Sequence, residues 1–375
     1  MASALADLQI VDFSRVLAGP LATMVLADLG AEVTKVERPG SGDETRTWGP
    51  PYDDTGMATY FQSINRNKAS VVLDLHAAAD IQRARRLVAG ADVVVENFRP
   101  GVMDRIGLGF EELATANPSL VYCSITGFGS GAGAALPGYD LLVQAVGGLM
   151  SITGAEDGEP QKVGVALVDV VCGLFASVGI LAALRHREQT GEGQRVELDL
   201  LSCLLAALVN QGSAYTAAGE VATRMGNGHR SVAPYDLFQA ADGELVIAVG
   251  TDEQFRQLTA TLGCPGLAGE AAFSTNTARV ANRDRLREEL EARLVTRPAS
   301  HWVTALSTAG VPAGQVNDIA GAFALAERLG LRPIVEIPRP DGGVARLTRN
   351  PIGLSVTPAS YRTPPPPLPD SMIRS

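Results

Sequence analysis

Short apolar runs alternate with amphipathic stretches over the first 130 residues of the chain. Gly, Asp or Pro bounds each run, which favours buried strands over pieces of buried helix. A helix is expected over Gly19–Leu29, with Pro20 in its first turn. Strands that alternate with helices predict a parallel sheet of the α/β class, with a Rossmann-like opening. The expected strands are Leu8–Asp12, Ala31–Val36, Ser70–Leu73, Asp92–Val95 and Leu120–Ile125.

After residue 130 the pattern shifts to long apolar helices, with one further strand at Gln194–Leu198. From about residue 226, shorter helices surround a strand at Glu244–Val249, which predicts a second, smaller α/β unit. The proline-rich end, including Pro364–Pro367, predicts an extended surface tail. The long helices are expected over Asp140–Met150, Val170–Arg187 and Leu201–Ala218.

The net charge of the chain is −10, from 41 acidic and 31 basic residues. A domain that coats nucleic acid or an anionic membrane would carry an excess of basic residues, so neither partner is expected. The N-terminus shows no signal-peptide pattern. The longest uncharged apolar run, Val170–Leu184, is too short for a bilayer core of about 30 Å. We therefore expect a soluble, cytoplasmic protein.

Metal and nucleotide motifs are missing from the sequence. The four cysteines lie far apart without a CxxC pair, and the four histidines form no HExxH, so no metal is expected. Glu37 stands where an acid would meet a ribose, but the preceding turn, Val16–Pro20, lacks the GxGxxG glycines of a nicotinamide site. There is also no phosphate-binding P-loop and no GxSxG hydrolase turn.

Asp169 is the most informative residue, because it is the only charge within Val163–Leu184. Val163–Val168 resembles a strand, and a helix is expected from Val170 onward. One interpretation makes Asp169 the cap of that helix. The other makes it a nucleophile, held ionised by the helix dipole and backbone N–H donors and kept from water by apolar walls. The two interpretations are compatible, and composition alone does not choose.

A series of stretches along nearly the whole chain resembles the class III CoA-transferase family, which includes formyl-CoA transferase and carnitine CoA-transferase. No single stretch is decisive, but the stretches occur in the family's order. They are Val11–Phe13, Val16–Pro20, Leu29–Val33, Lys35–Pro39, Asn65–Lys68, Leu73–Leu75, Glu96–Gly101, Gly138–Asp140, Gln144–Gly154, Gly179–Leu184, Thr190–Gln194, Gly226–His229, Pro234–Tyr235 and Gly310–Gly314.

The resemblance implies that Asp169 is the nucleophile. Its carboxylate would attack a donor acyl-CoA to give a mixed anhydride, which the CoA thiolate converts into an aspartyl-CoA thioester. The acceptor acid would attack that thioester, and the thiolate would complete the exchange. The relay keeps the energy of the thioester bond, so it implies acyl-CoA as substrate and no tightly bound cofactor. A small dicarboxylate such as succinate is the acid that the resemblance suggests.

The resemblance also implies binding residues. An oxyanion loop would map to Gly250, where the family usually has a run of glycines and this chain has one. Substrate contacts are expected from Leu17, Arg46, Tyr139 and His229. Leu17 replaces the glutamine of formyl-CoA transferase, which argues against oxalate and formate as the substrate pair. The CoA contacts map to Arg38, Leu73, His76, Asn97, Phe98 and Arg105.

Two other functions stay open at this point. An α-methylacyl-CoA racemase would share the fold and use Asp169, but racemases carry His where this chain has Tyr139, a poor base at neutral pH. An acyl-CoA binding protein without catalysis would have no need of Asp169 in its apolar frame.

The resemblance further implies an interlocked homodimer of two ring-like subunits, with each active site combining Asp169 of one subunit with loops of the other. The large α/β domain would span residues 1–200 and be completed by residues 330–375. A helical linker would span 201–225, and the small α/β domain 226–329.

Overall fold

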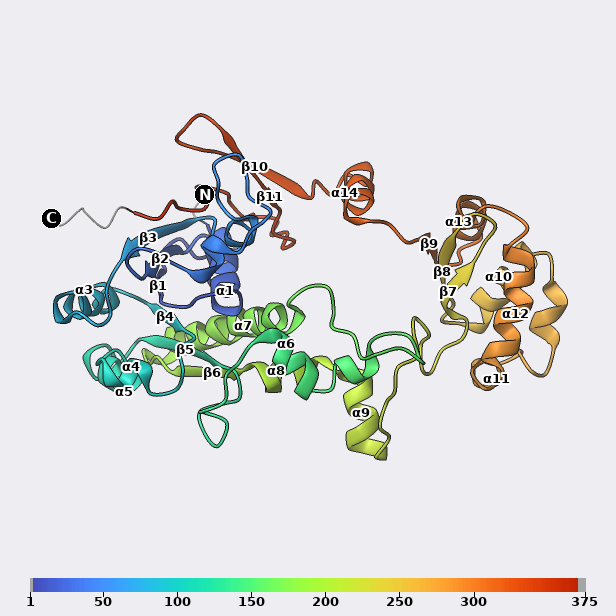
Figure 1. Cartoon of the computed structure of the whole chain (residues 1–375), viewed down its shortest axis with the longest axis horizontal. Helices are drawn as coiled ribbons and strands as arrows, with labels where there is room; N and C mark the ends of the chain where they lie inside the picture. The colour runs from blue at the N-terminus through green and yellow to red at the C-terminus, as the bar shows by residue number, and fades with distance from the viewer. Residues whose placement is uncertain (1–2, 370–375) are drawn as a thin grey trace. The chain divides into compact units, whose positions relative to one another are not determined.

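The structure is a computed structural model that describes residues 3–369 and divides into two compact units. Within the described chain, the first unit comprises residues 3–149, 162–221 and 332–369. The second comprises residues 150–161 and 222–331. Figure 1 shows that three separate segments of the chain build the first unit.

A six-stranded parallel sheet forms the centre of the first unit, which confirms the α/β class. Each strand lies within two residues of its predicted position, because apolar runs bounded by turn residues mark buried strands well. The strand order is β3-β2-β1-β4-β5-β6. The strands are β1 (Gln9–Asp12), β2 (Glu32–Glu37), β3 (Lys68–Val72), β4 (Val93–Glu96), β5 (Val121–Thr126) and β6 (Arg195–Asp199).

The strand order reverses between β1 and β4. The chain runs outward from β1 through β2 to β3, then returns to β4 on the other side of β1. The loops that follow β1 and β4 therefore diverge at the carboxyl edge of the sheet, and such switch points form ligand-binding crevices in open α/β sheets. Arg15–Leu17 and Asn97–Arg99 lie in these two loops.

Helices cover both faces of the sheet (Figure 1). One face packs against α1 (Ala18–Asp28) and α7 (Leu167–Thr190). These two helices lie so close that a Cβ atom at Gly173 of α7 would stand 2.6 Å from the backbone oxygen of Ala18, so only glycine allows the contact. The other face packs against α3 (Ala78–Ala89), α4 (Val102–Arg105) and α5 (Phe110–Ala116).

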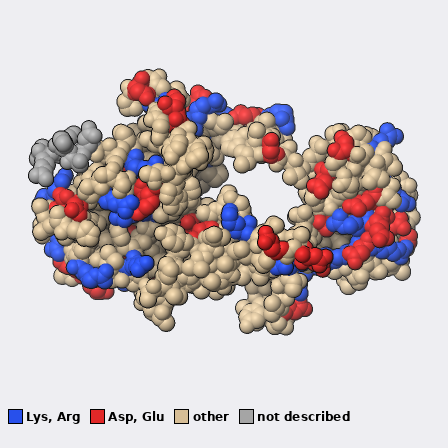
Figure 2. Space-filling view, in the orientation of Figure 1, with Lys and Arg blue, Asp and Glu red and all other residues tan. Residues whose placement is uncertain are grey.

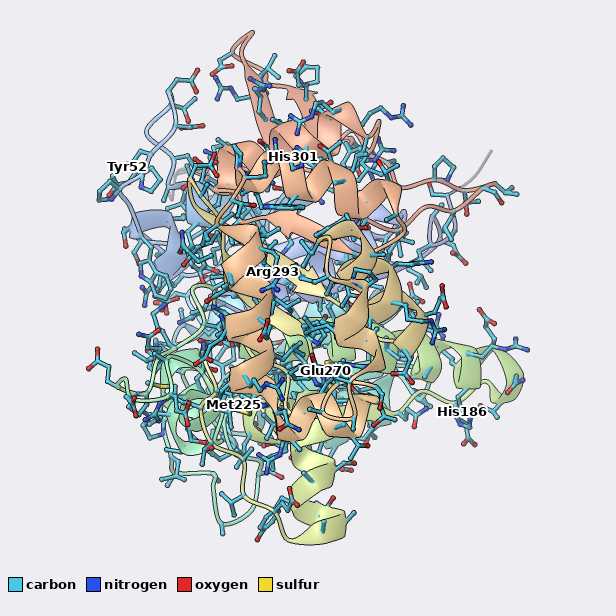
Figure 3. The ribbon with its side chains drawn as sticks, turned by 90° about the vertical axis from the view of Figure 1, so that its right-hand side faces the viewer. Tyr52, His186, Met225, Glu270, Arg293 and His301 are labelled. Carbon is cyan, nitrogen blue, oxygen red and sulfur yellow. The ribbon has the colours of Figure 1, made fainter. Side chains whose placement is uncertain are left out.

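Helix α7 differs from its expected form. It begins at Leu167 and has 24 residues, so residues 163–166 precede a helix and form no strand. By length and composition alone α7 could cross a membrane, contrary to the sequence-based estimate, but half of its most apolar window is buried inside the structure. Its buried residues, such as Cys172 and Ile180, belong to the core of the first unit. Its exposed last turns carry His186 (Figure 3).

The single helix expected over Leu201–Ala218 is wrong. The segment forms α8 (Leu200–Ala207) and α9 (Val209–Ala218), bent by 86°. Val209 has a φ of 42°, in the left-handed region, which interrupts the helix. Leu200, Cys203 and Leu204 hold α8 in the core, whereas α9 has no buried residue to keep it in line.

The second unit has an antiparallel sheet of order β7-β8-β9 (Tyr235–Gln239, Glu244–Ala248 and Ala313–Gln315). Its core includes Leu245, Phe255 and Leu290. Acidic and basic side chains are interspersed on its surface (Figure 2). One of them is Glu270 (Figure 3), which pairs with Arg285 at 2.7 Å. Its helices are α10 (Asp252–Thr261), α11 (Asn276–Ala281), α12 (Arg283–Leu294), α13 (Ala299–Thr308) and α14 (Ile319–Arg328).

The C-terminal segment is more structured than the expected surface tail. It starts with an antiparallel hairpin of β10 (Ile334–Pro338) and β11 (Val344–Thr348). Arg362 then donates hydrogen bonds to backbone oxygens in the turn between α1 and β2, including Ala31 at 2.8 Å. Pro365 and Pro366 are buried. The prolines predict an extended tail on the surface, but this part of the chain packs against the rest of the first unit.

Asp28, the last residue of α1, ties this segment to the sheet domain. Its carboxylate accepts two hydrogen bonds from the Arg66 guanidinium, at 2.9 and 2.6 Å. It also accepts from Asn67 at 2.8 Å and from Asn350 at 3.0 Å. All four side chains are buried, so each polar group depends on the others for its partners.

Replacing Asp28 by Ala should lower the free energy of unfolding by about 3–5 kcal/mol, because it leaves a buried guanidinium and two amides without their acceptor. Chemical denaturation measures the loss. The control is Glu112→Ala, which removes the exposed pair Arg85–Glu112 and should cost less than about 1 kcal/mol. Equal losses in the two variants would contradict the central place of Asp28.

Candidate active site

A buried charge network fixes the loop between β1 and α1. Lys35 donates to the backbone oxygen of Ser14 at 2.8 Å and pairs with Asp43 at 2.9 Å. Lys68 donates to Asp12 at 3.1 Å and to the backbone oxygen of Pro20 at 2.8 Å. Burial lowers the pKa of Lys68 to about 8 against the attraction of Asp12. The loop is therefore anchored on both sides by lysines that reach its backbone.

Asn97, in the loop that follows β4, clamps the loop between β1 and α1. Its amide accepts from the backbone N–H of Arg15 at 2.9 Å and donates to the backbone oxygen of Arg15 at 2.7 Å. The next residue, Val16, has a φ of 67°, a strained value for a β-branched side chain. The clamp helps to hold this conformation, so Asn97, expected as a CoA contact, also positions the loop.

Asp169 lies in the first turn of α7, and the expectation that it caps the helix is wrong. The cap position is Ala166, which makes no side-chain capping bond. Asp140, at the start of α6 (Asp140–Val146), caps α7 instead. Its Oδ1 atom accepts from the backbone N–H groups of Val168 at 2.8 Å and of Asp169 at 3.3 Å.

The Asp169 carboxylate is half-buried and accepts no hydrogen bond from residues 3–369. Burial raises its pKa to about 7, and the charge of Asp140 adds to the effect. The expectation that N–H donors hold this carboxylate ionised is therefore wrong, because Asp140 occupies the nearest donors. At neutral pH, the ionised and protonated forms of the Asp169 side chain are therefore both populated, and the ionised form is poorly stabilised.

A cavity of about 280 Å³ opens beside Asp169. Leu17 and Tyr139, both expected at the substrate, lie in its wall, as does Trp48. Trp48 stacks edge-on against Tyr60, with ring centroids 5.2 Å apart. Burial, followed by the charge of Asp169, raises the pKa of Tyr60 to about 12. Besides Asp169, Leu17, Tyr139 and Trp48, the lining comprises Arg15, Val16, Ala18, Glu44, Asn97, Phe98, Arg99, Ile125, Thr126, Gly127, Gly138 and Leu200.

A second cavity, of about 190 Å³, is lined by four of the expected CoA residues, Arg38, Leu73, His76 and Phe98. Arg15 and Phe98 line both cavities, and the Arg15 guanidinium lies 4.9 Å from the centroid of the Phe98 ring. The two cavities are therefore neighbours across this pair. The remaining expected contact, Arg105, is exposed at the end of α4 and lines neither cavity.

Arg46 is not placed to bind substrate, contrary to the sequence-based expectation. Its guanidinium forms a bidentate pair with Glu37, with both distances 2.7 Å, and lies 3.7 Å from the centroid of the Phe61 ring. It also donates to the backbone oxygen of Pro366. Since Glu37 and Arg46 neutralise one another, neither is a ligand group here. Sequence spacing gave no signal of this pair.

Gly250 and His229 belong to the second unit. The N–H of Gly250 donates to the Gln254 side chain at 2.9 Å, within the capping box that begins α10. His229 accepts from the N–H of Ser231 at 3.1 Å and its ring lies against Tyr235. The roles expected of Gly250 and His229 stay predictions. In the described part of the chain, no three His, Cys, Asp or Glu side chains group as metal ligands.

The sequence-based search missed Asp140, Trp48, Tyr60 and Arg15 as site residues. Asp140 lies in one of the stretches that resemble the family, Gly138–Asp140. The sequence does not indicate that Asp140, 29 positions before Asp169, caps the helix that carries Asp169. Trp48 and Tyr60 follow irregular segments that carry no periodic pattern. Arg15 precedes a strained turn that only backbone geometry reveals.

Replacing Asp169 by Asn should stabilise the fold, more at high pH than at low pH. The raised pKa means that ionisation of Asp169 costs stability as pH rises from about 4 to about 7. At pH 8 we expect a gain of about 1–3 kcal/mol, which shrinks toward pH 5. Denaturation at both pH values measures it, with the exposed Asp7→Asn as control. A gain that does not depend on pH would contradict the raised pKa.

Comparisons with known proteins match nearly the whole chain to one family. The family model described as CoA-transferase family III matches residues 5–370. The succinate–glutarate CoA-transferase of Agrobacterium fabrum is 42% identical over 372 residues, covering 97% of this chain and 92% of the relative. The acetyl-CoA:oxalate CoA-transferase of Acetobacter aceti is 42% identical, covering 93% of this chain and 88% of the relative.

A solved CaiB/BaiF family protein from Brucella suis superposes with a TM-score of 0.86 at 42% identity, and the match covers 98% of this chain and 97% of that protein. With one family matched from end to end in sequence and in fold, the chain belongs to CoA-transferase family III.

Proposed function

We propose that this enzyme moves CoA from an acyl-CoA donor to a small dicarboxylic acid, such as succinate or glutarate, through an aspartyl-CoA thioester on Asp169. The observation that carries the proposal is the half-buried Asp169 carboxylate, without a hydrogen-bond donor and with a pKa near 7, in a cavity next to that of the CoA residues. The relatives' names support the acids, since they include succinate, glutarate and oxalate.

The chemistry follows from the state of the carboxylate. The ionised oxygen of Asp169 attacks the donor thioester carbonyl, and the electron pair of the C–S bond leaves on the CoA sulfur. The thiolate then attacks the Asp169 carbonyl of the resulting anhydride and releases the donor acid. The acceptor acid reverses these two steps with its own carboxylate. A carboxylate with few hydrogen bonds is a stronger nucleophile than a solvated one.

CoA follows the two neighbouring cavities. Its adenosine phosphate end lies with Leu73, His76 and the Arg38 guanidinium. The chain of CoA passes Arg15 and Phe98 and brings the thioester to Asp169.

The second carboxylate of the acid requires a cation, and Arg99 replaces Arg46 in this role. Arg99 lines the cavity of Asp169 and is exposed. Arg15 lines the same cavity but shares Glu44 with Arg38, at 3.6 and 3.2 Å. The basic lining of the cavity comes from these two residues, Arg15 and Arg99, and suits a dicarboxylate better than a monocarboxylate.

With succinyl-CoA and glutarate, the enzyme should form glutaryl-CoA, and Asp169→Ala should lower the rate at least about 1,000-fold because the relay loses its covalent carrier. Mass spectrometry of the CoA esters measures transfer, and a panel of acids that includes oxalate and acetate defines the acceptor. CoA binding by the variant should persist.

Hydroxylamine provides the matched control, because it captures an activated aspartate. The wild type incubated with succinyl-CoA should carry a hydroxamate on Asp169, whereas a mere binder should not. Transfer by Asp169→Ala within tenfold of the wild type would refute the nucleophile. Turnover-rate exchange of the α-hydrogen of a 2-methylacyl-CoA would favour the racemase, which Tyr139 disfavours.

We also propose that the enzyme is a cytoplasmic, interlocked homodimer whose two domains are the two compact units. Support comes from an apolar face of α7, where Leu174, Phe175, Val178 and Leu181 recur along one side of the helix. Val178 is 64% exposed and Leu174 49%. Monomers rarely expose a continuous apolar surface of this kind, which marks an interface.

Light scattering should show a dimer that does not dissociate on dilution, because threaded rings separate only by unfolding. Val178→Asp on the α7 face should impair assembly, while Val221→Asp, at an exposed valine outside α7, should not. A folded, active monomer would refute the proposal.

A further inference from the structure

Asp140 uses both of its carboxylate oxygens as acceptors. Oδ1 accepts from the backbone N–H groups of Val168 and Asp169, and Oδ2 accepts from the Gln144 amide at 2.6 Å. A protonated carboxyl would have to donate from one of these oxygens toward another donor. Asp140 is therefore held as a carboxylate, in direct contact with the backbone of Asp169.

Gln144 extends this arrangement to the chain that enters α7. Its side chain is fully buried, and its Oε1 accepts from the N–H of Val163 at 2.9 Å. Asp140 and Gln144, four residues apart on α6, thus hold both Val163 and the first turn of α7. Because these hydrogen bonds hold the chain on both sides of the start of α7, the position of Asp169 depends on Asp140 and Gln144.

We propose that Asp140 is a positioning residue that caps the helix of the nucleophile and keeps a second negative charge beside it, so that acylation of Asp169 relieves a repulsion built into the resting enzyme. This inference rests on the proposed function of Asp169. A helix N-terminus ordinarily stabilises a carboxylate in its first turn. Here Asp140 takes two of these donors, and its charge adds to the effect of burial in raising the pKa of Asp169.

The repulsion acts on one state of the reaction cycle. When an oxygen of Asp169 bonds to the acyl carbon, the C–S bond breaks and the negative charge leaves with the CoA sulfur. The anhydride and the aspartyl-CoA thioester are neutral at Asp169, so the charge of Asp140 no longer opposes them. The resting carboxylate is thereby raised in free energy relative to the acylated states, which lowers the barrier to its attack.

Other charged and titratable groups face Asp169 as well. Burial raises the pKa of Tyr60 of α2 (Thr59–Gln62) to about 12, so Tyr60 is neutral near pH 7. A hydrogen bond with Cys203, followed by burial, raises the pKa of the Cys172 thiol, one turn along α7. Arg15, Glu44 and Arg99 line the cavity wall. Glu44 is paired with Arg15 and Arg38, so among the charged groups named here Asp140 is the one whose charge raises the pKa of Asp169.

The test is the pH dependence of kcat/KM for Asp140→Asn, which keeps the shape of the side chain and removes its charge. The midpoint of the acidic limb should fall by about one pH unit or more, and kcat on the plateau should fall about tenfold or more. KM for the acyl-CoA should change little. If Asp140 only caps the helix, Asp140→Asn would lower the stability of the enzyme and leave the midpoint of the acidic limb at the wild-type pH. That outcome would overturn the proposal.

Two further variants keep the test decisive if Asp140→Asn folds poorly. The double variant Asp140→Asn, Gln144→Glu restores a full set of donors and acceptors and moves the charge one turn along α6, so it should fold and still lower the midpoint. Gln144→Met loses the hydrogen bonds of the Gln144 side chain to Asp140, Val163 and Val165 but keeps the charge of Asp140, so its midpoint should stay at the wild-type value. A lowered midpoint in Gln144→Met would contradict the role of charge.

The state of Asp169 is also measured without turnover. In protein labelled at the aspartate side-chain carbon, ¹³C NMR follows the Asp169 carboxyl, assigned by its loss in Asp169→Asn. Its titration should shift to lower pH in Asp140→Asn. If Asp169 is not the nucleophile, hydroxylamine captures nothing in the wild type. If capture succeeds and neither midpoint moves, the proposed function stands and the role of Asp140 falls.

Discussion

The loop between β1 and α1 depends on two buried lysines that reach its backbone. Burying a charge is costly, and Lys35 and Lys68 are tolerated because Asp43 and Asp12 pair with them and each lysine also donates a hydrogen bond to a backbone oxygen. Removing either partner would leave a buried charge and release the loop. Through this loop the network helps to hold Val16 in its strained conformation and Arg15 between the two cavities, so the geometry of both cavities depends on the paired lysines.

A second constraint places Asp169. Helix α7 approaches α1 closely at Gly173, and Asp140 fixes its first turn from α6. These contacts hold Asp169 at the cavity but do not satisfy its carboxylate. The fold therefore keeps a group whose ionised form is poorly stabilised, and the proposed nucleophilic role of Asp169 draws on this conflict.

Much of the site could be predicted from the sequence, and the failures share a cause. Leu17, Tyr139 and Asp169 meet in one cavity, and Arg38, Leu73 and His76 in another, because loops at the carboxyl edge of a parallel sheet converge. The prediction of Arg46 as a substrate contact is wrong, because the sequence does not indicate that Glu37 will pair with a cation in this loop. Asp169 as a cap was misread for the same reason, because Asp140 comes from another helix. The bend at Val209 was also not predictable, because it depends on the packing of α8, and not α9, into the core of the first unit.

The sequence by itself determined the strands, most helices, the α/β class and the family, because apolar periodicity and turn residues act over a few neighbours. Tertiary structure decided which charges are paired, which donors are free and what the pKa of Asp169 is. These properties depend on groups brought together from distant positions, such as Asp28 with Asn350 and Asp140 with Val168. Electrostatic interaction depends on distance and burial in space, and neither quantity is written in the spacing of residues along a chain.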